Sequence, residues 1–180
     1  EMKRDILENN LGRIARMETL PAIETIPSPP FRYRTRIIFK IRDGKLGFFK
    51  RESHHIVEIE SCLLMPQFME DHLQSFREHP LVLETRKGEL RVMGNETEVV
   101  AHMKSDKKSG YLGRQEVMPF MVGDYIFNYR PENFIQANFH TLAPMLDFVS
   151  RSIEEGTYKT AVDLFSGTGF FSQPLSRLVQ

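Results

Sequence analysis

The chain has 180 residues, of which 41% are hydrophobic, and its 24 Lys and Arg balance its 24 Asp and Glu. This length suits one large domain or two small ones, and the apolar fraction together with 14 Phe excludes wholesale disorder. A single Cys excludes a disulfide framework, a Cys-rich zinc module and a cysteine-ligated iron–sulfur cluster formed by this chain alone. The sequence has neither a long apolar run nor a secretory signal, which predicts a cytoplasmic protein without membrane contact.

The first part of the chain predicts a helix, a connector and a small sheet. Leu7, Leu11 and Ile14 recur at the spacing of an amphipathic helix, which ends before Pro21. Four prolines within residues 21–30 then predict an extended connector. From residue 31 the period changes to two, so basic residues share one side of a strand: Arg32, Arg34, Arg36, Lys40 and Arg42. A hairpin at 43–44, a return strand over 45–50 and a short strand over 56–59 follow.

The basic residues are unevenly distributed along the chain. Residues 31–55 contain 8 Lys and Arg against 2 Asp and Glu, whereas residues 56–180 carry an acidic excess. Such a stripe is typical of a face that binds the phosphates of a nucleic acid. It is equally typical of the solvated outer face of an ordinary sheet, and the sequence leaves both interpretations open.

The middle of the chain predicts alternating helices and strands. Helical spacing over 65–79 predicts a helix that Pro80 stops. Strand-like runs cover 81–86, 89–93, 97–103, 115–122 and 124–129, and the polar segment 105–113 predicts an exposed loop. An apolar stripe then predicts a helix over 142–153.

The last 25 residues have a different pattern, because a short apolar strand at 160–165 leads into a Gly-x-Gly turn and a helix. This is the opening unit of a doubly wound α/β domain, so we expect the chain to be a fragment of a longer protein. An unpaired strand exposes its apolar side chains to water. We therefore expect Val162, Leu164 and Phe171 to pack against the helix over 142–153, with self-association completing the cover.

The glycine turn predicts a ligand site. Gly167 and Gly169 follow Asp163, and glycines let the backbone approach a ligand while the helix start offers amide donors. The turn lacks the third glycine of the dinucleotide fingerprint, which disfavours NAD and FAD. A tight structural turn is an equally good interpretation of these residues alone.

Several blocks together resemble one known family. Asp-Leu-Phe-Ser-Gly-Thr-Gly at 163–169 is similar to the first motif of class I methyltransferases, which holds S-adenosylmethionine. With Phe-Ile-Gln-Ala-Asn at 134–138, YRTRIIFKI at 33–41 and GFFKRESHHIVEIESCLLMP at 47–66, it resembles the RNA uracil-5-methyltransferases. The resemblance covers nearly the whole chain.

The resemblance implies an α/β protein with two parts. Residues 1–122 would form an antiparallel-rich α+β central domain that faces RNA. Residues 123–180 would supply the first strand and helix of a Rossmann-like class I methyltransferase domain. The implied activity is methyl transfer from S-adenosylmethionine to C5 of a uridine in rRNA or tRNA, after a cysteine thiolate adds to C6.

The resemblance also implies roles for particular residues. The expected cofactor-binding set is Gln136, Asp163, Phe165, Gly167 and Gly169. Phe134 is expected to contact a uracil flipped out of its stack, and the basic residues of the strand at 31–42 to contact phosphates. The family often has a small or amide residue at the position of Phe170, so a cofactor hydrogen bond there is not expected. The structural alternative places Phe134 in the core and makes Gln136 a cap of the following helix.

No catalytic or metal-binding residue is assigned within the chain. Cys62 lies in an upstream block between apolar residues, so we interpret it as a core residue. His54 and His55 point to opposite sides of a strand, which predicts solvated histidines. Two other functions stay open: a noncatalytic RNA-binding module with a remnant methyltransferase fold, and a methyltransferase of related fold that acts on another substrate.

Overall fold

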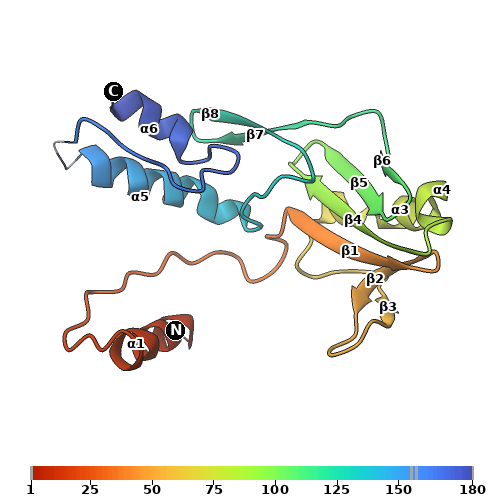
Figure 1. Cartoon of the computed structure of the whole chain (residues 1–180), viewed down its shortest axis with the longest axis horizontal. Coiled ribbons are helices and arrows are strands. Elements are labelled where there is room, and N and C mark those ends of the chain that lie inside the picture. Colours follow the sequence, from red (N-terminus) through yellow and green to blue (C-terminus); the bar gives the residue numbers. More distant parts are fainter. Residues whose placement is uncertain (1, 155, 157, 180) are drawn as a thin grey trace.

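The computed structural model describes residues 2–154, 156 and 158–179 (Figure 1). Its strands form a six-stranded sheet in the order β3-β2-β1-β4-β5-β6 and a separate sheet β7-β8. The large sheet comprises β1 (Arg36–Arg42), β2 (Lys45–Phe49), β3 (Ile56–Glu58), β4 (Lys87–Gly94), β5 (Val99–Ser105) and β6 (Ser109–Tyr111), and the small one β7 (Met118–Val122) and β8 (Tyr125–Tyr129). Every pairing is antiparallel, which confirms an α+β architecture rich in antiparallel strands.

The hairpin between β1 and β2 forms where the sequence predicted it. Asp43 and Gly44 both have left-handed backbones, with φ of +49° and +76°, as a tight two-residue turn requires. Along β1 the odd-numbered residues are buried and the even-numbered residues are half-buried. The predicted alternation is therefore confirmed, and it leaves one side of the sheet for the core and the other for polar residues.

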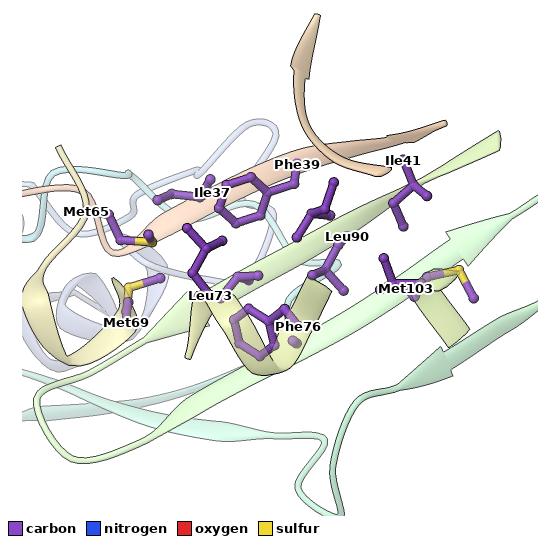
Figure 2. Packing of buried hydrophobic residues seen from close by; sticks show 13 residues of the cluster. Ile37, Phe39, Ile41, Met65, Met69, Leu73, Phe76, Leu90 and Met103 are labelled. Carbon is purple, nitrogen blue, oxygen red and sulfur yellow. The ribbon is translucent and has the colours of Figure 1, made fainter. Parts of the chain in front are cut away.

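Three short helices cover the inner side of the large sheet: α2 (Gln67–Glu70), α3 (Leu73–Glu78) and α4 (Pro80–Leu83). Figure 2 shows their apolar side chains, including Met69 and Phe76, against Phe39, Leu90 and Met103 of the sheet. These side chains are almost completely buried and form the first of two hydrophobic clusters. The first cluster fixes the orientation of β1 and thus of its outer face.

The helix predicted over 65–79 forms as two short helices, α2 and α3, and it ends before Pro80 as predicted. The strand predicted over 81–86 is wrong. Pro80 begins α4 there, because a proline at the first helical position loses no hydrogen bond. The His79 side chain accepts the Leu81 N–H at 3.2 Å and caps this helix. The predicted loop at 105–113 also contains β6, which pairs with β5.

The second cluster lies around the β7–β8 hairpin. Phe120, Phe127 and Tyr129 point inward from its strands, and Met93 and Val100 join them from the outer side of the large sheet. Leu142 and Leu146 come from α5 (Leu142–Glu154), which follows the 3₁₀ helix η1 (Phe139–Thr141) and confirms the predicted helix. The hairpin and α5 thereby pack on one end of the outer sheet face.

The strand predicted over 160–165 does not form. Its apolar side chains face solvent, with Val162 76% and Leu164 77% exposed, so the expected packing of these two residues is also wrong. A parallel strand needs a neighbouring strand for its hydrogen bonds, and no described strand pairs with this segment. The helix beyond it does form, as α6 (Ser172–Leu178), and Phe171 packs against the second cluster as predicted.

The amino-terminal helix α1 (Met2–Arg13) stands apart from both sheets (Figure 1). The prediction of a helix here is confirmed, although none of its residues is buried. An extended segment without regular structure links it to β1, as the prolines predicted. Within the described part of the chain, no helix combines the length and apolarity needed to cross a membrane.

Candidate functional site

The outer face of the large sheet carries a group of basic side chains. Arg36, Lys40 and Arg42 alternate along β1, and the register places Arg91 and Lys87 of β4 beside them. The inner cluster holds the opposite face of the same strands, so these side chains have to point outward. The basic face is defined here as Arg34, Arg36, Lys40, Arg42, Lys87 and Arg91.

The charges of this basic face are only partly compensated. Glu89 of β4 accepts hydrogen bonds from Lys40 at 3.1 Å and Arg91 at 2.8 Å. Burial alone would raise the pKa of Glu89, but these two bonds lower it below its usual range. Arg36 forms no ion pair within the described part of the chain, and burial together with the charges of Arg91 and Arg34 lowers its pKa. A bound anion would relieve this repulsion.

The segment 130–138 lies against the basic face although it is about 100 residues away in sequence. The Thr35 N–H donates to the Ala137 carbonyl at 2.9 Å, and Arg34 forms a β-bridge with Asn138. Arg36 Nε donates to the Asn133 carbonyl at 3.1 Å. The structure thus brings together two features that the sequence treated separately, the basic strand and the Phe-x-Gln-x-Asn motif.

Phe134 is 67% exposed, and its ring lies under the guanidinium of Arg36 at 5.8 Å from the ring centroid. The alternative of a core phenylalanine is therefore wrong. Gln136 is also exposed and does not cap a helix, because Asn138 Oδ1 accepts the His140 N–H at 3.2 Å instead. An exposed ring beside a guanidinium offers a stacking surface and a positive charge to one nucleotide.

Arg32 does not belong to this face, contrary to the sequence prediction of its strand position. Its backbone has a left-handed φ of +58° and lies before β1. Its guanidinium donates to the Met65 carbonyl at 2.8 Å and forms an ion pair with Glu70. The same carboxylate accepts the Cys62 N–H at 2.8 Å. Arg32 therefore ties the loop before α2 to the sheet, and its predicted contact with RNA stays untested.

The glycine turn forms a second, separate feature. Phe165, Gly167 and Gly169 all have left-handed backbones, with φ of +60°, +56° and +77°. A Cβ built on either glycine would meet nothing closer than 3.8 Å, so the space beside the turn is open. Ser172 donates to Asp163 at 2.6 Å, and both residues line a cavity of about 530 Å³. Phe165 is fully exposed.

The predicted cofactor residues are only partly gathered. Of the five predicted residues, only Asp163 lines the cavity of about 530 Å³. Gly169 lines a different cavity, of about 350 Å³. Across the described residues, no hydrogen bond joins Gln136 to Phe165, Gly167 or Gly169. The roles of these residues in cofactor binding therefore stay predictions.

Sequence reasoning missed a polar group beneath the segment 130–134. Tyr111 of β6 donates to Glu132 at 2.8 Å, and the nearly buried His102 of β5 lies 3.5 Å from the same carboxylate. Ser109 lies 2.9 Å from His102 Nε2. Burial and the bond to Glu132 raise the pKa of Tyr111 to about 12, so the phenol keeps its proton. A histidine inside the apolar run at 97–103 was the signal available in the sequence.

The cysteine and histidine interpretations agree with the structure. Cys62 is half-buried against the first cluster, and His54 and His55 are both exposed. Across residues 2–154, 156 and 158–179, no group of three or more His, Cys, Asp or Glu side chains is arranged to hold a metal ion.

Comparison with known proteins identifies several relatives. The chain is 30% identical, over 97% of its length, to an uncharacterized RNA methyltransferase of Aquifex aeolicus, of which it covers 48%. It is 25% identical, over 92% of its length, to a 23S rRNA (uracil(1939)-C(5))-methyltransferase of a Marinomonas species, of which it covers 45%. No protein-family profile matches the chain.

A solved structure shares the fold. The tRNA (uracil-54, C5)-methyltransferase of Pyrococcus abyssi, crystallised with S-adenosyl-L-homocysteine, superposes with a TM-score of 0.70 at 20% identity. The match covers 97% of this chain and 53% of that one. The chain thus spans about half the length of the relatives it matches.

Proposed function

We infer from these relatives that the chain belongs to the RNA uracil-5-methyltransferase family. On that basis we propose that it forms the RNA-facing part and the start of the cofactor-binding part of an enzyme that methylates C5 of a uridine in rRNA or tRNA. The methyl donor in this proposal is S-adenosylmethionine, since the related archaeal enzyme binds its demethylated product. The proposal assigns residues 1–122 to a central domain and residues 123–180 to the methyltransferase domain. β7 and β8 pair across this boundary, because the turn at 123–124 joins them.

The observation that carries the RNA proposal is the contact between Arg36 and Phe134. A nucleotide consists of a phosphate and a planar base, and this contact presents a guanidinium and an exposed ring side by side. Arg34, just before β1, and Arg42, at its end, extend the positive charge along the sheet, where neighbouring phosphates of an RNA strand would lie. In this arrangement Phe134 would stack on the base.

The residues around the glycine turn fit a cofactor of this kind. A cavity of about 530 Å³ is within the range of small-molecule sites. Gly167 and Gly169 have left-handed backbones and carry no side chain, so a ligand can approach the main chain closely at these two positions. We propose that Asp163, Phe165, Gly167 and Gly169 hold S-adenosylmethionine, which supplies an electrophilic methyl group when bound, and that Gln136 completes the contact.

The proposed chemistry requires a thiolate and a base. C5 of uracil becomes nucleophilic only after a thiolate adds to C6, and a base must then remove the C5 proton. Cys62 is unsuited to the first task, because it packs against the first cluster on the inner side of the sheet, whereas Phe134 lies over the outer face. We therefore assign neither group to this chain.

The test is an assay of the protein at its native length with undermethylated bulk RNA and S-adenosylmethionine labelled in the methyl group. The RNA is digested to nucleosides, and each labelled nucleoside is identified by mass spectrometry. We expect the label in 5-methyluridine. Phe134→Ala should lower the yield of labelled 5-methyluridine about tenfold or more relative to the parent protein. Phe148→Ala removes another exposed phenylalanine, on α5, and should leave this yield unchanged.

Two results would contradict the proposal in different ways. Label in another nucleoside, or on an exocyclic nitrogen, would indicate a methyltransferase of related fold with another substrate. RNA binding that depends on Phe134 without any methyl transfer would indicate the noncatalytic RNA-binding module.

A further inference from the structure

Three strands of the large sheet, the neighbours β1 and β4 and the edge strand β6, hold the segment that presents Phe134. Arg36 of β1 donates to the Asn133 carbonyl, Arg91 of β4 donates to the Glu132 carbonyl at 3.4 Å, and Tyr111 of β6 donates to the Glu132 side chain. All three donors are on the outer face of the sheet. The two acceptor residues directly precede Phe134 in the chain.

The segment is also held on both sides of these contacts. After Phe134, Ile135 is buried in the second cluster, and Ala137 accepts the Thr35 N–H. A turn closes the segment, in which Asn133 accepts the Arg130 N–H at 2.9 Å and returns its own N–H to the Arg130 carbonyl at 2.9 Å. Phe134 itself is exposed, so no apolar contact in the core fixes its ring. The buried Ile135 therefore fixes the chain after the ring, whereas the polar contacts at residues 132 and 133 fix the chain before it.

The shortest of the three contacts from the sheet is at the carboxylate of Glu132. A hydrogen bond from a hydroxyl to a carboxylate is stronger than a hydrogen bond between two neutral groups. Tyr111 forms such a bond with Glu132 at 2.8 Å. The Tyr111 ring is itself held, since its centroid lies 4.7 Å from that of His102, which is only 6% exposed. His102 Nε2 lies between Ser109 and Glu132, at 2.9 and 3.5 Å. The bond between Tyr111 and Glu132, called here the anchor, is thus supported by His102 of β5 and Ser109 of β6.

We propose that Glu132 is a positioning residue: bound by Tyr111, it holds Phe134 over Arg36 in the orientation that receives a base. This inference rests on the proposed function for its consequence, because the anchor affects RNA only if Phe134 binds it. Glu132 itself touches no base. Its carboxylate points under the segment, toward β5 and β6, while Phe134 faces solvent.

The absence of tryptophan from the sequence allows a direct test. Phe134→Trp places a single fluorescent indole, called here the reporter, at the tip of the segment. In this background Tyr111→Phe removes the donor and keeps the ring, whereas Glu132→Ala removes the acceptor and Glu132→Gln restores an acceptor oxygen. Tyr125→Phe is the matched control, because its hydroxyl takes part in no hydrogen bond of the described residues.

We expect Tyr111→Phe and Glu132→Ala to lower the fluorescence anisotropy of the reporter and to raise its quenching by iodide about twofold or more. Glu132→Gln should recover part of the change, and Tyr125→Phe should leave both signals unaltered. Iodide quenching that is the same in the Phe134→Trp parent and in its Tyr111→Phe and Glu132→Ala derivatives, all folded by circular dichroism, would overturn the proposal.

The binding of a single-stranded uridine-containing RNA then separates this inference from the proposed function. We expect Tyr111→Phe to raise the RNA dissociation constant about threefold or more. This is the rise that follows when the fraction of molecules with Phe134 in the binding orientation falls to about a third. A reporter that becomes mobile while the RNA affinity stays unchanged would support the anchor and contradict the role of Phe134 in RNA binding. Weaker RNA binding with an unaltered reporter signal would contradict the anchor.

Discussion

The guanidinium of Arg36 and the ring of Phe134 lie 5.8 Å apart, and Arg36 also bonds the carbonyl of Asn133, which is 97 residues away along the chain. Arg36 comes from the first strand of the large sheet, and Phe134 from the segment that follows β8. Within the described part of the chain, Arg36 is not paired with a carboxylate, and Phe134 is not covered by the core. The contact therefore forms an accessible surface with one cation and one aromatic face, on which the proposed function depends.

Removing two arginines of the basic face tests their contact with phosphates. We expect Arg34→Ala with Arg36→Ala to weaken RNA binding and to flatten its salt dependence by about one to two units of slope. The reason is that fewer counterions leave the RNA on binding when a phosphate contact is lost. Affinity is measured by fluorescence anisotropy across a salt series. Lys107→Ala with Arg151→Ala changes the net charge equally at exposed positions elsewhere and should keep the slope. Equal slopes in both double variants would assign the arginines to an ordinary solvated face.

Phe134 tests the stacking contact separately from charge. Stacking on an aromatic side chain contributes about 1 to 3 kcal/mol per base, so Phe134→Ala should raise the RNA dissociation constant about 5-fold to 150-fold. Phe134→Tyr keeps the ring and should bind nearly as the parent does. The salt slope should stay constant in both, since no cation is lost. A slope that changed with Phe134→Ala would show that the residue acts through Arg36 instead.

The Tyr111 phenol predicts a pH dependence of stability. Its pKa is raised to about 12 in the folded protein, against about 10 in an unfolded chain. A raised pKa means that the stabilisation is complete below pH 10 and is lost as the pH rises toward 12. The difference in unfolding free energy between the parent and Tyr111→Phe should therefore shrink over this range. Urea titrations at several pH values measure it, and a constant difference would contradict the assigned bond.

Glu70 and Arg32 should affect stability without affecting RNA. Glu70→Ala leaves the Cys62 N–H and the Arg32 guanidinium without their partner in a half-buried loop, which should lower the unfolding free energy by about 2 to 3 kcal/mol. Glu84→Ala removes an exposed ion pair with Lys108 and should cause little change. Arg32→Ala should leave the salt slope of RNA binding intact. A flatter slope would return Arg32 to the phosphate-binding set.

Local patterns in the sequence predicted the elements that depend on local chemistry. The alternation along β1, the Asp43-Gly44 turn, the strands β7 and β8 and the apolar stripe of α5 each follow from residues within one element. The basic side of β1 followed from the same alternation. The contact of that side with Phe134 did not, because it depends on hydrogen bonds between segments about 100 residues apart.

The errors have physical causes in longer-range structure. Pro80 follows the end of one helix as predicted, yet the same ring suits the first position of another once His79 caps it. Arg32 continues the alternating pattern, but its bond to Glu70 turns it away from the strand face. Residues 160–165 have the composition of a buried strand, and composition alone does not provide the neighbouring strand that its hydrogen bonds require. Tyr111 and Glu132 meet only after β6 joins the sheet.

Photo-crosslinking tests the central claim most directly. A single-stranded RNA that carries 5-bromouridine is bound to the protein and irradiated, and the crosslinked peptide is identified by mass spectrometry. The proposed site predicts that the crosslink lies within residues 131–137, at or beside Phe134, and that Arg34→Ala with Arg36→Ala lowers its yield. A crosslink confined to other segments, such as α1 or the connector at 21–30, would contradict the assignment of the Arg36–Phe134 surface as the site that receives the uridine.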